Sequence, residues 1–315
     1  MIGTARAPGT CGELVQGITE GVNFLVTCPV DMYSVVTVKL DKSGVIRAAA
    51  DLPKVRLAVE KVLRFFDAGE MGAEVLVSSS LPRGKGMASS TADISAACAA
   101  AAAALGTFLT PSEIAEIALS IEPTDGIMFP GITMFDHVQG KLARVLGPAP
   151  ELEAFIVDLG GTVDTIGFNA NFDLELKNRE KEDKVDQALK KLERAISQAD
   201  CRLAGEAATE SAFANQHILC KPRLDRLLEI CREAGGVGIS AAHSGTVVGL
   251  LFEANRKPAC DVASILAGEG FHNIFRTRLI DGGVQVLRES AGDKVWQSLS
   301  TYTGGTYGRL RKNTG

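Results

Sequence analysis

Residues 82–90 combine the side chains and backbone features that a phosphate-binding loop needs. The segment reads Pro82-Arg83-Gly84-Lys85-Gly86-Met87-Ala88-Ser89-Ser90 and stands directly before a run typical of a helix. Glycines let backbone N–H groups gather around an anion, and the first N–H groups of a helix stabilise negative charge. Lys85 offers a point charge, Ser89 suits phosphate oxygens, and Ser90 offers a hydroxyl oxygen to Mg²⁺. The segment predicts a loop that binds phosphate groups together with Mg²⁺, with a plain structural turn as the alternative.

This loop differs from the two commonest phosphate-loop patterns. Gly84 and Lys85 are followed by Gly86 instead of Ser or Thr, and the upstream glycine of a Walker A loop is missing. The segment is not a full GxGxxG motif either. Local pattern alone therefore leaves the class of nucleotide-binding protein open.

The composition excludes several classes of protein. The 315 residues are 46% hydrophobic and 23% charged, which is typical of a globular protein with a real core. A net charge of -5 argues against nucleic-acid binding, and the alanine tract 96–104 is too short to span a bilayer. The N-terminus lacks the pattern of an export signal, so we expect a cytoplasmic protein without membrane partners. The seven cysteines form no CxxC pair, which disfavours a metal site built by the protein alone.

The first half of the chain should form a sheet with buried helices. Strands are predicted at 23–28, 33–40 and 74–78, and apolar spacing predicts a helix over 54–69. A helix is also expected over 90–106, with Ser90 and Asp93 as a capping box and Gly106 at its end. Because alanine occupies nearly every face of that helix, it should lie in the centre of the core.

A chain of this length predicts two domains, which we place at 1–150 and 151–315. Before the boundary, a helix over 111–121 capped by Thr110 should lead to Glu122, and strands near 133–138 and 141–145 should follow. The second half predicts a strand at 154–158, a helical region reaching 215, a helix at 224–234 and a strand at 246–252. This order favours an α+β fold.

Three segments, in order, resemble the motifs of the GHMP kinase superfamily. Residues 7–13, APGTCGE, resemble a shortened form of the family's first motif, with Thr10 where several relatives have lysine. Residues 82–92 resemble the second motif, with Met87 in place of leucine, and 235–246 resemble the glycine-rich loop that packs against the nucleotide site. The resemblance implies a two-domain GHMP kinase fold. Its N-terminal domain would be like the second domain of ribosomal protein S5, and its C-terminal domain would be ferredoxin-like.

Within this superfamily, residues 5–17, 27–31 and 160–169 look most similar to the L-threonine kinases of cobalamin biosynthesis. That resemblance implies phosphorylation of the threonine side-chain hydroxyl by Mg-ATP. The product, O-phospho-L-threonine, would be a precursor of the aminopropanol linker of cobalamin. The alternatives are a kinase for another hydroxyl compound such as homoserine, and a non-catalytic ligand sensor on the same fold.

The resemblance also implies roles for two carboxylates. Glu122 corresponds to the family's magnesium carboxylate opposite the Ser90 hydroxyl, with an ordinary charge at a helix end as the alternative. Asp125 is the candidate to orient or deprotonate the substrate hydroxyl, although an Asp-Gly pair also suits a turn. Asp136 is the reserve candidate, and homoserine kinases resemble this family yet lack a clear base.

An amino-acid substrate needs an anion near its ammonium group and a donor near its carboxylate. The candidates for the ammonium group are Glu13, Asp31 and Asp164. The carboxylate could face Arg6, Thr10 or the third glycine-rich loop, where Ser244 is a substrate candidate beside His243. The sequence predicts no oligomeric state.

Overall fold

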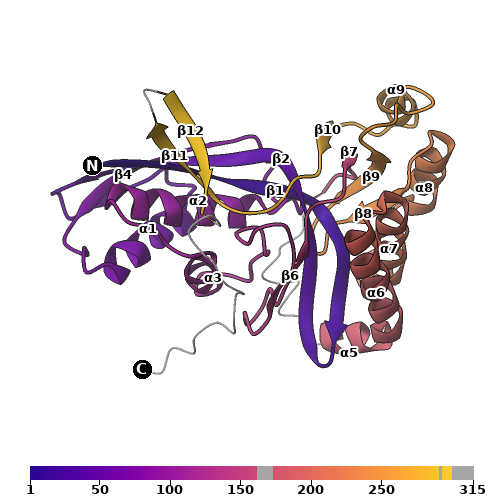
Figure 1. The fold of residues 1–315 in the computed structure, drawn as a ribbon, viewed down its shortest axis with the longest axis horizontal. Helices are drawn as coiled ribbons and strands as arrows, with labels where there is room; N and C mark the ends of the chain where they lie inside the picture. Colours follow the sequence, from indigo (N-terminus) through magenta and orange to yellow (C-terminus); the bar gives the residue numbers. More distant parts are fainter. Residues whose placement is uncertain (162–172, 291–292, 300–315) are drawn as a thin grey trace.

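The structure, a computed structural model, describes residues 1–161, 173–290 and 293–299. Its centre is a sheet built around two long antiparallel strands, β1 (Ile2–Thr19) and β2 (Val22–Asp41), which run from one half of the molecule into the other (Figure 1). The main strand order is β10-β7-β9-β8-β1-β2-β4-β3. The other strands in this order are β3 (Ile46–Arg47), β4 (Gly72–Ser79), β7 (Leu152–Asp158), β8 (Gly238–Ala241), β9 (Val247–Glu253) and β10 (Ile274–Arg278).

Two further strand pairs complete the sheet. Strand β5 (Ile132–Phe135) pairs with β2 and with β6 (Ala143–Gly147). Near the end of the chain, β11 (Gln285–Ser290) and β12 (Asp293–Ser298) form a hairpin, and β11 pairs with β1 at Ala5 and Arg6. The last strands thus return to the first half, and a domain boundary near residue 150 stays a prediction. In the described part of the chain, no helix has the length and apolar character needed to cross a membrane.

The strands predicted at 23–28 and 33–40 are parts of one strand, β2, and residues 7–13 lie inside β1. Separate strands were expected because proline and glycine usually mark turns. Here they lie where the pairing is irregular: it jumps from Pro8 opposite Tyr33 to Gly9 opposite Val30. Proline lacks a backbone N–H and is tolerated at such bulges. The turn signals therefore mark bends within two continuous strands.

The alanine-rich helix lies in the core, as predicted. Helices α1 (Pro53–Phe65), α2 (Ser89–Ala104) and α3 (Pro111–Leu119) lie on one side of the sheet, with α2 against β1 and β2 (Figure 1). Residues 96–102 of α2 are at most 1% exposed. A Cβ atom on Gly3 of β1 would lie only 2.2 Å from the carbonyl oxygen of Ala100. Small residues on both elements thus allow strand and helix to approach closely.

The predicted capping box at the start of α2 is wrong. The N-cap position is Ala88, which has a left-handed backbone and makes no capping hydrogen bond through its side chain. Ser90 donates to Glu122 instead, and Asp93 accepts a hydrogen bond from the Ser34 hydroxyl. Both side chains therefore have tertiary partners that outcompete local capping. At α3 the predicted cap is confirmed, because Thr110 accepts from the backbone N–H of Glu113.

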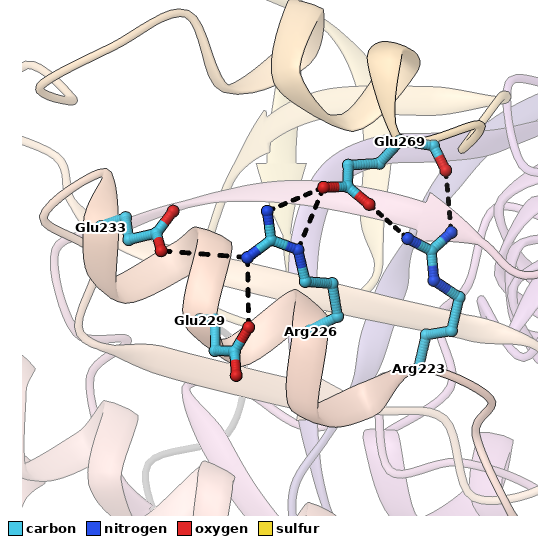
Figure 2. A network of polar contacts seen from close by, with 5 residues as sticks. All are labelled: Arg223, Arg226, Glu229, Glu233 and Glu269. Atoms are coloured by element: carbon cyan, nitrogen blue, oxygen red, sulfur yellow. Dashed lines mark hydrogen bonds and ion pairs between the residues drawn. The ribbon is translucent and has the colours of Figure 1, made fainter.

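The helices of the second half are α5 (Asp173–Glu180), α6 (Glu182–Gln198), α7 (Cys201–Ala214), α8 (Leu224–Glu233) and α9 (Val262–Gly268). The predicted long helical region is interrupted at Ala199, which has a φ of 50°, and Asp200 then caps α7. At the surface, Arg223 and Arg226 bind Glu269 beyond the end of α9, and Arg226 also binds Glu229 (Figure 2). This network ties α8 to α9 away from the cavity described next.

Candidate active site

The loop between β4 and α2 has the backbone of an anion-binding turn. Gly84, Gly86 and Ala88 have left-handed φ angles of 69°, 81° and 54°. The backbone N–H of Thr10 in β1 donates to the carbonyl of Met87 at 3.1 Å, and the Met87 side chain is fully buried. Since the N-cap side chain makes no capping bond, the start of α2 keeps N–H groups available to an anion. The contact with β1 and the buried Met87 side chain thus hold this loop in place.

The phosphate loop borders a cavity of about 370 Å³. Residues 51–55 before and within α1, the segment 122–125 after α3, and His243 and Ser244 form its other walls. Most of the residues with a predicted site role line this cavity: Glu13, Arg83, Gly84, Gly86, Ala88, Ser89, Ser90, Glu122, Asp125 and Ser244. The fold therefore gathers residues from both halves of the sequence around one space.

Seven other described residues with predicted roles do not line the cavity: Arg6, Thr10, Asp31, Pro82, Lys85, Met87 and Asp136. The Lys85 ammonium group binds the Asp158 carboxylate and the Gly161 carbonyl, at 2.9 and 2.7 Å. Asp31 lies at the surface, 3.0 Å from Arg278. Lys85 and Asp31 thus have ion-pair partners outside the cavity lining, and their roles as phosphate and substrate ligands stay predictions. Asp164 lies outside the described residues.

Ser90 and Glu122 meet at the cavity wall. The Ser90 hydroxyl donates to Oε1 of Glu122, and the Lys54 ammonium group of α1 binds Oε2. The Glu122 side chain is only 5% exposed, whereas that of Lys54 is 41% exposed. Hydroxyl and carboxylate oxygens are ligands that Mg²⁺ prefers, and the carboxylate already holds a cationic group. The donor set therefore fits a magnesium ion.

Asp125 carries a partly buried carboxyl group with a raised pKa. Burial raises its pKa to about 6, the hydrogen bond from the Thr91 hydroxyl lowers it, and the nearby Glu122 charge raises it. The Thr91 hydroxyl lies 3.4 Å from Oδ2, and the backbone N–H of Asp125 lies 3.3 Å from Thr91 Oγ1. The predicted turn and the predicted site are therefore compatible, because Thr91 holds both the backbone and the side chain.

Glu13 of β1 supplies a second buried carboxyl group. The residue is 3% exposed and lines the cavity, and within the described residues its Oε2 atom has no hydrogen-bond partner. Burial, followed by the charges of Asp125 and Cys11, raises its pKa well above the usual range. A buried acceptor without a partner is costly, and a cationic ligand in the cavity would satisfy it.

Comparisons with known proteins identify the family. The GHMP kinases N terminal domain matches residues 54–130, and the GHMP kinases C terminal domain matches residues 188–266. The L-threonine kinase of Salmonella typhimurium is 37% identical over 259 residues, which cover 81% of this chain and 84% of the relative. The L-threonine kinase of Citrobacter freundii is 36% identical over 256 residues, covering 80% and 87%.

This chain belongs to the GHMP kinases. Solved structures agree in fold: mevalonate kinase has a TM-score of 0.68 and 16% identity, covering 88% of this chain and 99% of the other. Homoserine kinase from Cytophaga hutchinsonii has a TM-score of 0.70 and 16% identity, covering 91% and 97%. A related structure, described as a complex with MVAPP, AMPPCP and magnesium, has a TM-score of 0.67 and 17% identity, covering 92% and 99%. The predicted α+β fold with two GHMP kinase domains is confirmed.

In this GHMP kinase the third glycine-rich segment lies directly against the phosphate loop. The backbone N–H groups of Thr246 and Val247 donate to the Lys85 carbonyl, at 2.9 and 3.1 Å. A Cβ atom on Gly245 would lie 2.3 Å from the Cα atom of Gly86, and one on Gly86 would lie 2.8 Å from that of Gly245. Both positions therefore need glycine for this approach.

Two histidines form the wall of the kinase cavity beside Glu13. The rings of His137 and His243 meet edge to face, with centroids 5.1 Å apart. Nδ1 of His243 lies 2.8 Å from the side-chain oxygen of Gln16 in β1. Burial, followed by the charges of His137, Lys181 and Lys221, lowers the pKa of His243 well below its usual range. His243 therefore stays neutral near pH 7 and links the glycine-rich loop to β1.

Lys54, Thr91 and His137 are among the cavity residues that sequence reasoning missed. Thr91 continues the Ser-Ser run of the phosphate loop, so its type and position were a usable signal. His137 follows a predicted strand beside Asp136, with no spacing that suggests a ligand. Lys54 lies 68 residues before its partner Glu122, so no local pattern could have joined them.

Proposed function

We propose that this GHMP kinase transfers the terminal phosphoryl group of ATP to the side-chain hydroxyl of L-threonine. The observation that carries the proposal is that Ser90, Glu122 and Asp125 line one cavity with the phosphate loop. The choice of threonine rests on the similarity to two L-threonine kinases, at 37% and 36% identity. The product, O-phospho-L-threonine, would serve the aminopropanol linker of cobalamin.

The phosphate loop has the features to bind the triphosphate of ATP. The glycines at 84 and 86 free the backbone to turn its N–H groups toward the cavity, and the start of α2 adds a partial positive charge. Arg83 lines the same space and supplies a guanidinium group for phosphate oxygens. Binding through the backbone requires no particular base, so specificity for adenine would depend on other residues.

Ser90 and Glu122 would hold the magnesium ion that accompanies the nucleotide. When bound, such an ion neutralises negative charge on the phosphate oxygens. Glu122 is buried at the end of the α3 segment, so its carboxylate is held in place before the nucleotide arrives. The serine hydroxyl and the carboxylate would therefore orient the metal complex against the start of α2.

Asp125 would accept the proton of the threonine hydroxyl as the hydroxyl oxygen attacks phosphorus. A base is most effective when its pKa is close to the working pH, and burial raises the pKa of Asp125 to about 6. Thr91 would keep the carboxylate oriented through the contact at 3.4 Å. Near neutral pH the group is then mostly ionised and ready to accept a proton.

Glu13 would bind the ammonium group of threonine. A cation would satisfy its Oε2 atom and favour the ionised carboxylate. Ser244 lines the same cavity and offers a hydroxyl donor to the substrate carboxylate. With Asp125 at the reacting hydroxyl, the three groups would fix the orientation of an amino acid with a short side chain.

A phosphotransfer assay with L-threonine, L-serine and L-homoserine side by side tests the function. We expect threonine to have the highest kcat/KM. Serine lacks the methyl group, which costs about 10- to 200-fold in such sites, and homoserine carries its hydroxyl group one carbon further from the ammonium and carboxylate groups. A higher kcat/KM for homoserine would contradict the assignment of threonine as the substrate. Nucleotide binding without transfer to any hydroxyl compound would instead indicate a ligand sensor.

The location and partners of the enzyme stay predictions from composition. A net charge of -5 favours an enzyme without nucleic-acid partners, and we expect it in the cytoplasm. Cell fractionation, together with a nucleic-acid retention assay at low salt, would test both expectations.

A further inference from the structure

Lys54 is placed where a metal-binding carboxylate meets the cavity. It lies in the first turn of α1, directly after Pro53, and its ammonium group binds Oε2 of Glu122. Its side chain is 41% exposed and lines the cavity, whereas the Glu122 side chain is 5% exposed. The buried partner of this ion pair is therefore fixed, and the exposed partner can move.

Carboxyl groups outnumber basic side chains around the cavity, so the Lys54 ammonium group matters for the binding of an anion. Five carboxyl groups line it, from Glu13, Asp51, Asp93, Glu122 and Asp125. Within the described residues, the lysine and arginine side chains that line the cavity are those of Lys54 and Arg83, and Arg83 binds Asp51 at 2.5 Å. A triphosphate entering such an acidic space needs every available cation.

Lys54 and a magnesium ion would compete for the same carboxylate. Two cations on one buried oxygen pair repel each other, so the ammonium group leaves Glu122 when a metal binds there. The lysine side chain has a flexible stem of four carbons, and its ammonium group binds phosphate as a point charge. The exposed Lys54 side chain can therefore turn toward phosphate oxygens without movement of α1.

We propose that Lys54 holds Glu122 in the nucleotide-free enzyme and moves to the triphosphate when the magnesium complex of ATP binds. This inference rests on the proposed kinase function and adds a positioning residue to it. One consequence concerns the order of binding. Free metal would bind poorly while Lys54 occupies Glu122, so the metal would bind together with the nucleotide. A second consequence is that removal of the ammonium group changes metal binding and nucleotide binding in opposite directions.

The test uses the full chain and two binding measurements that do not need turnover. Mn²⁺ binding to the nucleotide-free protein is followed by electron paramagnetic resonance, and binding of AMPPNP with Mg²⁺ by calorimetry. For Lys54→Met we expect Mn²⁺ affinity to rise and AMPPNP affinity to fall, each by about tenfold, the worth of one charge-assisted contact. Lys54→Arg should retain most of the AMPPNP affinity.

Lys61→Met is the matched control, because Lys61 lies on α1 about 10 Å further along the helix and does not line the cavity. It should leave both affinities unchanged. Unchanged affinities in Lys54→Met, or a parallel loss of both with a lower Tm, would overturn the inference. If the wild-type chain phosphorylates threonine while Lys54→Met gives one of these two results, the proposed function stands and only the role of Lys54 is overturned. If the wild-type chain binds no nucleotide, the proposed function fails first.

Discussion

The Lys85 ammonium group lies 2.9 Å from Oδ2 of Asp158, so the phosphate loop is tied to the end of β7. The same carboxylate accepts a hydrogen bond from the Thr246 hydroxyl at 2.6 Å. Burial works against ionisation of Asp158, but the hydrogen bonds from Thr246 and Lys85 outweigh it and lower its pKa. One carboxylate thus connects the phosphate loop with Thr246, at the end of the glycine-rich loop 235–246.

Asp158→Asn should lower both the Tm and the affinity for AMPPNP, since it releases the phosphate loop from the glycine-rich loop. Because the folded pKa is lowered, the carboxylate stabilises the fold above its ordinary pKa of 3.8, and this contribution is lost as the pH falls below it. Thermal unfolding between about pH 3 and pH 8, a range that extends above and below the ordinary pKa of aspartate, measures the effect.

A double-mutant cycle with Lys85→Met should give a coupling of at least about 0.5 kcal/mol. Glu269→Gln, in the network of Figure 2, is a control that alters ion pairs away from the cavity. Additive effects of the Lys85 and Asp158 substitutions would contradict the connection.

Ser90→Ala and Glu122→Gln should each lower kcat/KM for ATP by roughly 100-fold, the usual scale for a lost electrostatic contact to the reacting phosphate. Each variant removes one oxygen ligand or its charge from the proposed metal site. Steady-state kinetics at several Mg²⁺ concentrations should also show a higher metal requirement. Circular dichroism should show a preserved fold, and wild-type kinetics in both variants would remove the metal assignment.

Asp125→Asn should lower kcat by about 100- to 10,000-fold while AMPPNP still binds, because a proton acceptor is lost. In the wild type, kcat/KM should rise with pH through an inflection near 6, as Asp125 of the free enzyme loses its proton. Thr91→Val removes a hydrogen bond that lowers this pKa, so the inflection should move to higher pH.

Asp136→Asn is the control for that profile. Asp136 accepts backbone N–H groups of Val138, Gln139 and Lys141 at 3.0 to 3.1 Å and closes the turn after β5. Its substitution should lower the Tm but leave the inflection in place. An inflection that follows Asp136 instead of Asp125 would reverse the assignment of the base.

Glu13→Gln should weaken the binding of threonine and raise the stability of the fold near pH 8. The folded pKa of Glu13 is raised, so its contribution to stability is complete below the ordinary pKa of 4.5 and is lost as the pH rises. Near pH 8 the neutral glutamine should therefore raise the Tm, and the difference should vanish near pH 4. The KM for threonine should rise at the same time.

Glu74→Gln, on the exposed face of β4, is the matched control for Glu13→Gln. Its Tm should equal that of the wild type at about pH 4 and about pH 8, and its KM for threonine should be unchanged. A Glu13→Gln variant that is less stable than the wild type near pH 8 would show that the carboxylate has a structural partner.

Much of the fold could be predicted from local pattern. The alanine-rich α2, the cap at Thr110 and the glycine-rich loop before α2 each depend on residues within a few positions of one another. The continuous course of β1 and β2 could not be predicted, because Pro8 and Pro29 lie at bulges and give the same signal as turns. The strands after residue 253 are short and lack clear alternation, so they were missed.

Part of the candidate site could also be predicted from the sequence, and part could not. The roles of Glu122 and Asp125 were predicted from the resemblance to the GHMP kinases, and both residues line one cavity with Ser90. Lys85 was expected to bind phosphate because of its position in the loop, yet its partner Asp158 lies more than 70 residues away. Long-range ion pairs of this kind depend on the tertiary fold, and loop composition carries no information about them.

The pairing of β1 has a consequence for how the polypeptide can be divided. Besides β2, this strand takes β8 at Glu13 and β11 at Ala5 and Arg6 as partners, and both come from the second half of the chain. A fragment cut at the turn before β7 would therefore leave unsatisfied amide and carbonyl groups along the edge of β1. Such edges invite aggregation, so the two halves should fail to accumulate as separately expressed soluble pieces.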